Sequence, residues 1–284
     1  MFDSFFHKDR YENSEATFTY YYMWRKAGNI RWGIAAGCLC ILLDFSGRPF
    51  AFSPFGVEEG KFPEALAAIE DHFRVIGKPF YMRGITGQTP DLFARFAPDR
   101  YVLSPNRESF DYLYRGDDLR QLAGRRYAGK RNHIHAFMKE YSDYRYQAID
   151  EVNLPDCIAY AEKWFERHKA TRYLAAERTA TMDILQQFLF LGLKGAVIEV
   201  DGKIEALTLG EALGPDVAVI HTEKANAAMR GLYQVINRDF CCREWADKEY
   251  INREEDMGVE GLRTAKLSYY PCRMVEKYQA IDNE

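Results

Sequence analysis

The sequence predicts a mixed α/β protein built from two similar lobes. Apolar residues make up 47% of the 284 positions and charged residues 28%, which is normal for a globular protein with a sizeable core. One order of elements then occurs twice: a strand hairpin, a helix, a strand, a short helix and a last strand. Several corresponding elements of the two halves are separated by about the same number of residues, so we interpret the recurrence as a tandem duplication of one fold unit.

The first half begins with an aromatic-rich helix, 14–26, which ends before Ala27-Gly28. Two apolar runs in 33–55, divided by a turn at 44–49, predict a hairpin. Apolar residues at helical spacing predict a helix over 62–75. A strand at 79–85, a helix that opens at Thr89-Pro90 and a strand at 110–114 complete this half.

The second half repeats the order. The apolar runs 195–211 and 216–222 have turn residues at 201–202 and 214–215, which predicts paired strands. The elements expected after them are a helix at 232–245, a strand at 249–252, a helix at 259–267 and a strand at 273–281. Two further helices are expected before the second hairpin, at 156–168 and 181–193.

A basic segment, 117–141, lies between the halves and is predicted to form one connecting helix. We therefore divide the chain into a first lobe 1–116, the basic helix 117–141 and a second lobe 142–284, which we expect to be the active one. Two interpretations of the basic residues stay open: a solvated helix face, or a ridge that binds phosphate-bearing material. They are Arg125, Arg126, Lys130, Arg131, His133, His135 and Lys139.

Charge and targeting patterns exclude several classes. A formal net charge of −4 argues against global attraction to nucleic acid or anionic lipid. The N-terminus carries charges where a secretory signal has its apolar core, and the longest uncharged apolar run, 32–43, is shorter than the roughly 20 residues of a spanning helix. We expect a cytoplasmic protein without an integral membrane segment. Six Cys residues form no CxxC pair, so no metal site is predicted.

Four segments carry a resemblance to a known family: YAGKRNHIHAF (127–137), IHTEKA (220–225), GLYQVIN (231–237) and INREEDMGVEGLRTAKLSY (251–269). Together they resemble a bacterial family similar to the C-terminal catalytic region of phosphatidylglycerol lysyltransferases. The resemblance covers nearly the whole chain. It implies two GNAT-like (acyl-CoA N-acyltransferase-like) domains in tandem, joined by a basic helix. It also implies transfer of an aminoacyl group from charged tRNA to a lipid head group.

In GNAT-like folds the donor lies where the central strand ends and the next helix begins, which this resemblance places between 220 and 231. Acyl transfer needs a group that removes a proton and a donor that steadies the oxyanion. Glu223 is the first choice for the base and His221 the alternative, and two residues apart on a strand they share a face. Tyr233 and Asn237 share a helix face and can each donate a hydrogen bond. The alternative is that all four are ordinary strand-end or core residues.

The loop 225–231 has one glycine and does not match the [Q/R]xxGx[G/A] phosphate loop of CoA-dependent GNAT enzymes. Arg230 could still help a helix N-terminus to bind an anion. In 252–267, we expect Glu254 or Asp256 to pair with Arg263 or Lys266 and shape a polar pocket. The long family match favours a binding role for Asn252, Arg263 and Lys266, against the alternative of a surface loop with a capped helix.

The leading hypothesis is a transferase that moves an aminoacyl or other acyl group onto an amine or hydroxyl. The donor would be aminoacyl-tRNA bound through Arg126, Lys130, Arg131 and His133. The acceptor would be a small molecule, a peptide or a lipid head group. Two alternatives stay open: an N-acyltransferase that uses acyl-CoA, and a non-catalytic binding module on the same scaffold.

Overall fold

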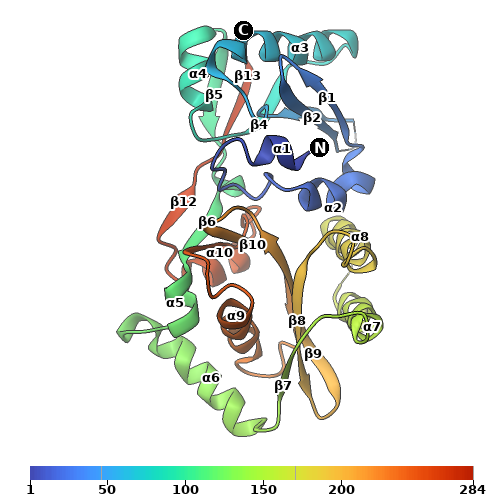
Figure 1. Ribbon diagram of the computed structural model, residues 1–284, viewed down its shortest axis with the longest axis vertical. Coiled ribbons are helices and arrows are strands. Elements are labelled where there is room, and N and C mark those ends of the chain that lie inside the picture. Colours follow the sequence, from blue (N-terminus) through green and yellow to red (C-terminus); the bar gives the residue numbers. More distant parts are fainter. Residues whose placement is uncertain (46, 170, 284) are drawn as a thin grey trace. The chain divides into compact units, whose positions relative to one another are not determined.

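The computed structural model describes residues 1–45, 47–169 and 171–283 (Figure 1). Ser46, in the predicted turn 44–49, lies outside them. The contacts of the chain divide it into two compact units. The first unit comprises 1–111, 255–263 and 274–284, and the second comprises 112–254 and 264–273. Each unit is described by itself below.

The first unit contains a six-stranded mixed sheet in the order β1-β2-β3-β4-β13-β5. The predicted hairpin is present as the antiparallel strands β1, β2 and β3, and β3 runs parallel to β4. β13, near the C-terminal end of the chain, is antiparallel to both β4 and β5. The strands are β1 (Arg31–Ala35), β2 (Cys38–Asp44), β3 (Pro49–Phe52), β4 (Tyr81–Ile85), β5 (Tyr101–Pro105) and β13 (Tyr278–Asp282).

Helices α3 and α4 cover one face of this sheet, and an apolar core lies between them and the strands. Phe62, Ile69 and Phe73 of α3 pack there with Met82 of β4 and Phe93 of α4. This spacing is the one from which the sequence predicts the helix. The helices are α1 (Asp3–Phe6), α2 (Phe18–Gly28), α3 (Phe62–Val75) and α4 (Thr89–Phe96), with 3-10 turns η1 (Glu59–Lys61) and η2 (Arg107–Ser109).

The second unit contains a seven-stranded mixed sheet in the order β12-β6-β11-β10-β9-β8-β7. β7 to β10 form an antiparallel run, β10 is parallel to β11, and β6 is antiparallel to β11. The predicted turn between β8 and β9 is present, with Asp201 and Gly202 both at positive φ, as a tight hairpin requires. The strands are β6 (Asp111–Arg115), β7 (Arg145–Ala148), β8 (Lys194–Val200), β9 (Lys203–Ala212), β10 (Val217–Ala225), β11 (Tyr250–Asn252) and β12 (Arg273–Val275).

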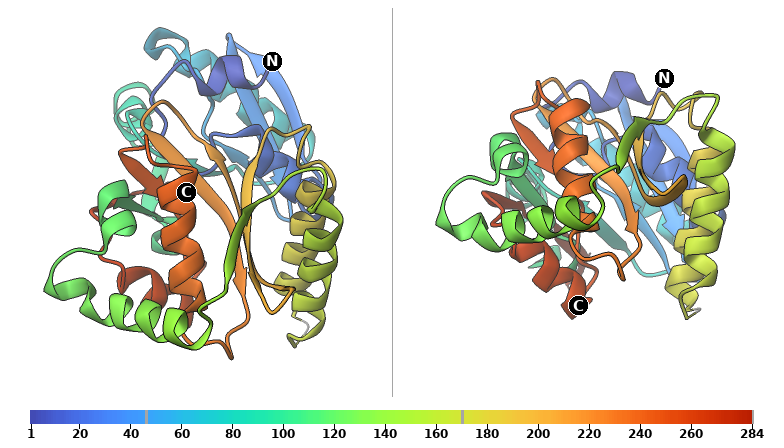
Figure 2. Two further views of the ribbon diagram at one scale, coloured as in Figure 1. Left: turned by 60° about the horizontal axis from the view of Figure 1, so that its bottom comes forward. Right: turned by 90° about the horizontal axis from the view of Figure 1, so that it is seen from below.

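Helix α9 lies on one face of this sheet, and α7 and α8 lie on the other (Figures 1 and 2). α6 packs against α9 on the first of these faces. The helices are α5 (Gly116–Gln121), α6 (Ala128–Glu140), α7 (Leu154–Glu166), α8 (Arg172–Gln186) and α9 (Leu232–Arg243), with the turn η3 (Arg125–Tyr127), while α10 (Glu260–Leu267) has residues in both units. No helix within the described part of the chain has the length and apolar character needed to cross a bilayer.

The structure corrects two predictions about individual elements. The basic segment 117–141 is not one helix, because Leu122 and Gly124 adopt positive φ and separate α5 from η3 and α6. The predicted last strand, 273–281, is two strands, and β13 pairs in the sheet of the first unit. The contact units are therefore not contiguous in sequence, whereas the predicted lobes are, since strand pairing joins segments that are remote along the chain.

Candidate functional site

Strand β10 carries the two residues proposed as bases. The pairing of β10 with β9 shifts register between Ile220 and Thr222, so a bulge lies at His221. Bulges of this kind re-aim side chains and are common beside active sites. Gly210 of β9 lies opposite, where a Cβ would collide with the Val219 carbonyl oxygen, so the close approach of the two strands depends on a glycine.

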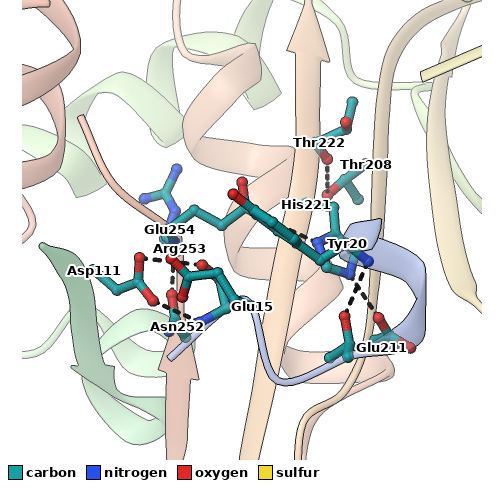
Figure 3. Close-up of polar contacts among 12 residues, drawn as sticks. Glu15, Tyr20, Asp111, Thr208, Glu211, His221, Thr222, Asn252, Arg253 and Glu254 are labelled. Carbon is teal, nitrogen blue, oxygen red and sulfur yellow. Dashed lines mark hydrogen bonds and ion pairs between the residues drawn. The ribbon is translucent and has the colours of Figure 1, made fainter. Parts of the chain in front are cut away.

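His221 is clamped between two carboxylates. Its Nδ1 lies 2.7 Å from Glu254 Oε1 and its Nε2 lies 2.8 Å from Glu211 Oε1 (Figure 3). Burial of the ring lowers the pKa of His221, but the hydrogen bonds and negative charges of both glutamates outweigh it and raise the pKa to about 10. The ring is therefore an imidazolium at neutral pH, with both nitrogens donating, and is not available there as a general base.

Glu223 has a separate set of partners. Its Oε1 accepts a hydrogen bond from Arg253 Nη2 at 3.0 Å and its Oε2 accepts one from Asn237 Nδ2 at 3.0 Å. Asn237 lies on α9, and Arg253 follows β11. The expected cooperation of Glu223 with His221 is thus indirect, through the consecutive residues Arg253 and Glu254.

Two polar atoms beside Glu223 are buried and have no hydrogen-bond partner among the residues that the structure describes. They are Arg253 Nη1, a donor, and Asn237 Oδ1, an acceptor. Burial lowers the pKa of Arg253, but the Glu223 carboxylate, followed by Tyr114 and Tyr269, raises it, so the guanidinium stays charged. Buried groups of this kind normally have partners, and a fixed cation with a spare N–H can steady a developing negative charge.

Lys130 of α6 reaches the same cluster. Its Nζ lies 2.6 Å from Ser268 Oγ and 3.9 Å from the centre of the Tyr269 ring. The Arg253 guanidinium carbon lies 4.9 Å from the same ring centre. Burial, and to a lesser extent the positive charge of Arg253, lower the pKa of Lys130 to about 8, against a smaller opposite effect of Glu223.

Two predicted residues hold the backbone on which Arg253 and Glu254 lie. Lys266 Nζ donates to the carbonyl oxygens of Arg253 at 2.5 Å and Glu254 at 3.1 Å. Asn252 Oδ1 accepts from the Glu254 N–H at 2.6 Å, and Glu254 adopts a φ of 54°, an uncommon value for a non-glycine residue. These contacts make Asn252 and Lys266 positioning residues.

The structure places the remaining predicted residues around this cluster or away from it. Arg126 pairs with Asp118 at 2.7 Å, and Arg131 Nη1 donates to the Gly124 carbonyl oxygen at 2.7 Å, so both guanidinium groups are engaged in structure. Arg230 is exposed and His133 is half-buried. The pKa of Tyr233 is raised by burial, while a backbone hydrogen bond with Ala225 opposes the rise.

Asp256 and Arg263 belong to the first contact unit. Arg263 donates to both carboxylate oxygens of Asp256 at 2.9 Å, and Arg107 lies 3.1 Å from the same carboxylate. This confirms the expectation that an acid of the segment pairs with a cation of α10. No group of three or more metal-ligating side chains with suitable geometry occurs in 1–45, 47–169 and 171–283.

Sequence reasoning missed three members of the cluster in the second unit: Arg253, Glu211 and Tyr269. Arg253 lies between the predicted residues Asn252 and Glu254, so its position in the sequence could have marked it as a site residue. Glu211 ends a β-strand run, and only the pairing of β9 with β10 brings it to His221. Tyr269 lies in one of the family motifs, but the sequence suggested no role for its side chain. Its contact with Lys130 joins residues more than a hundred positions apart, which a local pattern does not reveal.

Comparison with known proteins identifies relatives of the whole chain. Residues 9–281 match the family model "Phosphatidylglycerol lysyltransferase, C-terminal". A conserved protein of unknown function from Bacteroides thetaiotaomicron VPI-5482 is similar, with 30% identity, a TM-score of 0.90 and coverage of 99% of this chain and 95% of that chain. No curated protein sequence matches.

Two more solved structures share the fold. L-PGS from Bacillus licheniformis has 14% identity and a TM-score of 0.69, over 100% of this chain and 91% of that chain. FemX has 10% identity and a TM-score of 0.62, over 99% of this chain and 95% of that chain. At these identities the likeness shows the fold alone, a mixed α/β fold with two mixed sheets.

Proposed function

The chain belongs to the phosphatidylglycerol lysyltransferase C-terminal family, and from this premise we propose that it transfers an aminoacyl group to an amine or hydroxyl acceptor. The observation that supports this most directly is a pair of buried polar atoms on Arg253 and Asn237, which lie on either side of the Glu223 carboxylate and have no partner among the described residues. An acyl-transfer site needs such a donor for the oxyanion and an adjacent proton acceptor.

The proposed reaction uses Arg253 and Glu223 in different roles. The acceptor oxygen or nitrogen attacks the ester carbonyl carbon of the donor, and its proton passes to the Glu223 carboxylate. The tetrahedral oxyanion accepts a hydrogen bond from Arg253 Nη1, which is held in place by Glu223 Oε1. The carbon–oxygen bond to the donor then breaks, and the proton returns to the leaving oxygen. His221, an imidazolium, fixes Glu254 and takes no proton at neutral pH.

We propose aminoacyl-tRNA as the donor. Lys130 supports this best among the basic residues, because its ammonium lies in the same cluster as Arg253 and Tyr269. Arg126 and Arg131 are less available to phosphates. Arg126 is paired with the Asp118 carboxylate, and Arg131 donates to the Gly124 carbonyl oxygen. Binding through phosphates predicts an affinity that falls steeply with salt.

We also propose that the two sheets descend from one duplicated unit. Each has an antiparallel run followed by one parallel pair, β3 with β4 and β10 with β11. In each sheet an antiparallel strand from a remote part of the chain then follows, β13 in one and β6 in the other. The outermost strands β5 and β12 complete the match.

Thermal stability against a panel of ligands tests the donor first. Aminoacyl-tRNA at about 100 times its dissociation constant should add about 2.7 kcal/mol to the free energy of unfolding, more than deacylated tRNA adds. A shift with CoA thioesters alone would replace the proposal by CoA-dependent acyl transfer. No shift with any donor would favour a binding module.

Variants then test the chemistry, with lysyl-tRNA and vesicles containing phosphatidylglycerol as probes. Glu223→Gln should lower the rate of aminoacyl transfer roughly 10²–10⁴-fold, and Arg253→Met should lower it on the order of 10²–10³-fold. Glu249→Gln is the matched control, because Glu249 forms an exposed ion pair with Arg115 and should leave the rate unchanged. Equal rates in Glu223→Gln and the wild type would remove Glu223 from the reaction.

A further inference from the structure

A small cavity in the first unit lies apart from the residues discussed so far. Its volume is about 160 Å³. It is open to solvent on one side, and its lining comes from strands β1, β2 and β3, the end of helix α3 and the residues that follow α2 and α3. Its lining residues are Asn29, Arg31, Leu42, Leu43, Asp44, Pro49, His72, Ile76 and Lys78.

The sheet register explains why charged side chains meet here. Arg31 lies opposite Leu42 in the antiparallel pair of β1 and β2, so their side chains share a face. Asp44, two residues beyond Leu42, points to that face too, and Pro49 lies opposite Asp44. Leu42 and Ile76 pack against the apolar core and give the cavity an apolar wall.

Helix α3 ends in a way that brings Lys78 to the cavity. The N–H of Gly77 donates to the Arg74 carbonyl oxygen and the N–H of Lys78 donates to the Phe73 carbonyl oxygen, and Gly77 has a φ of 63°. This is the Schellman arrangement, which turns the chain back over the last helical turn. His72, in that last turn, lines the cavity as well.

The charges of this cavity are not neutralised by one another. Among the described residues, no hydrogen bond or ion pair engages the side chain of Asp44, Arg31 or Lys78; Arg31 and Lys78 are exposed and Asp44 is half-buried. Asp44 Oδ1 is buried and has no donor within that set. Burying a carboxylate oxygen without a donor is unfavourable, so this group is suited to a cationic hydrogen-bond donor from outside the chain.

Two kinds of charge therefore face one small space. Arg31 and Lys78 suit a carboxylate, and Asp44 suits an ammonium group. Asn29 and Ile76 directly follow the C-termini of α2 and α3, where the partial negative charge of a helix also favours a cation. A cavity of about 150 Å³ accommodates a molecule of about six non-hydrogen atoms such as benzene. A small amino acid such as alanine has this size and both charges.

We propose that this cavity binds a small zwitterionic amino acid, with its carboxylate on Arg31 and Lys78, its ammonium on Asp44 and its side chain against Leu42 and Ile76. The proposal does not depend on the aminoacyl transfer proposed above, since it concerns a different unit and other residues.

The test is calorimetric titration of the full chain with L-alanine, propionate, ethylamine and inorganic phosphate. L-alanine should bind saturably and at least about tenfold more tightly than propionate, which lacks the ammonium group, or ethylamine, which lacks the carboxylate. This comparison uses the unaltered protein, so it does not depend on the folding of a variant. No saturable binding of L-alanine, equal binding of propionate, or tighter binding of phosphate would each overturn the proposal.

Variants assign the charges. Asp44→Asn should remove most of the advantage of L-alanine over propionate, whereas Arg31→Gln should weaken both ligands by about the same factor. Lys61→Gln is the matched control, because Lys61 is an exposed cation of the same unit, paired with Glu64, and should leave binding unchanged. An unaltered preference for L-alanine in a folded Asp44→Asn protein would contradict the assigned role of Asp44.

Discussion

His221 shows how two neighbouring glutamates, Glu211 and Glu254, set the protonation state of a buried histidine. The pKa of His221 in the folded chain, about 10, lies above the value of about 6.5 for an unperturbed histidine side chain. Its contribution to stability is therefore complete below about pH 6.5 and is lost as the pH rises through about 10. His221→Gln should flatten the pH dependence of urea unfolding over this range.

The size of the effect follows from burial. Removing the imidazolium leaves Glu211 and Glu254 without their shared partner, and breaking a buried ion pair costs about 3–5 kcal/mol. The difference in unfolding free energy between wild type and His221→Gln should thus be largest near pH 6 and smallest near pH 10. A difference that grows with pH would show that the ring is neutral in the folded protein.

Lys130 predicts a pH dependence of donor binding. Because its pKa is lowered to about 8, part of the population is neutral at slightly alkaline pH. Phosphate binding favours the ammonium form, so the affinity for aminoacyl-tRNA should fall as the pH rises from about 7 to 9. Filter binding or fluorescence anisotropy measures this.

Lys130→Gln should weaken binding and remove its pH dependence, while Lys139→Gln, an exposed position at the end of the same helix, should keep it. A pH dependence that survives in Lys130→Gln would assign the titration to another group.

At the scale of elements, the junction of α6 and α9 depends on a single glycine. Gly231 precedes α9 with a φ of 95°, and a Cβ there would overlap the His133 carbonyl oxygen of α6. Gly231→Ala combines backbone strain with this collision, so it should destabilise the protein by about 2 kcal/mol or more.

Gly129→Ala is the internal control for this prediction. Gly129 lies within α6 with open space at its Cβ position, so alanine there should stabilise the helix by about 0.5–1 kcal/mol. Opposite signs in thermal unfolding of the two variants are expected. If both lower the melting temperature equally, the contact with His133 is not what requires the glycine.

The elements that the sequence predicted well are those whose signal is local. The bounds of α3 agree with its apolar spacing, and the β8–β9 hairpin has its Asp-Gly turn at the expected place. The segment 117–141 was predicted as one helix from the apolar spacing that begins at Tyr127, and a residue such as Leu122 gives no signal for the left-handed backbone that ends α5. β5 and β7 were missed because both runs are short and neither shows a clear alternation of apolar and polar residues.

For the whole molecule, the sequence predicted a mixed α/β fold but not which strands pair. The two halves read as contiguous repeats, yet β13 belongs to the first sheet and β6 to the second. Local patterns set the type of an element, whereas the choice of partner depends on side chains far along the chain. The candidate site followed the same rule: Glu223 and Lys266 were predicted from motifs, but the pairing of Glu223 with Arg253 required the fold.

One buried charge cluster accounts for part of this long-range order in the first unit. Lys277, fully buried, has its Nζ 2.7 Å from Asp111 Oδ1 and 2.7 Å from Glu15 Oε2. Burial lowers the pKa of Lys277, but Asp111 and then Glu15 raise it, so the ammonium is charged. The cluster joins residues near the start, the middle and the end of the chain and brings the segment before β13 to the first sheet.

Lys277→Met should therefore destabilise the protein by about 3–5 kcal/mol, because it removes the buried cation that both carboxylates contact. Urea unfolding measures this, with Lys61→Met as the control, since its exposed pair with Glu64 is worth at most about 1 kcal/mol. Adding Glu15→Gln and Asp111→Asn to Lys277→Met should recover much of the loss, because the buried charges are then gone. If the triple variant is instead less stable than Lys277→Met, the carboxylates stabilise the fold through other contacts, and the order of the first sheet does not depend on their pairing with Lys277.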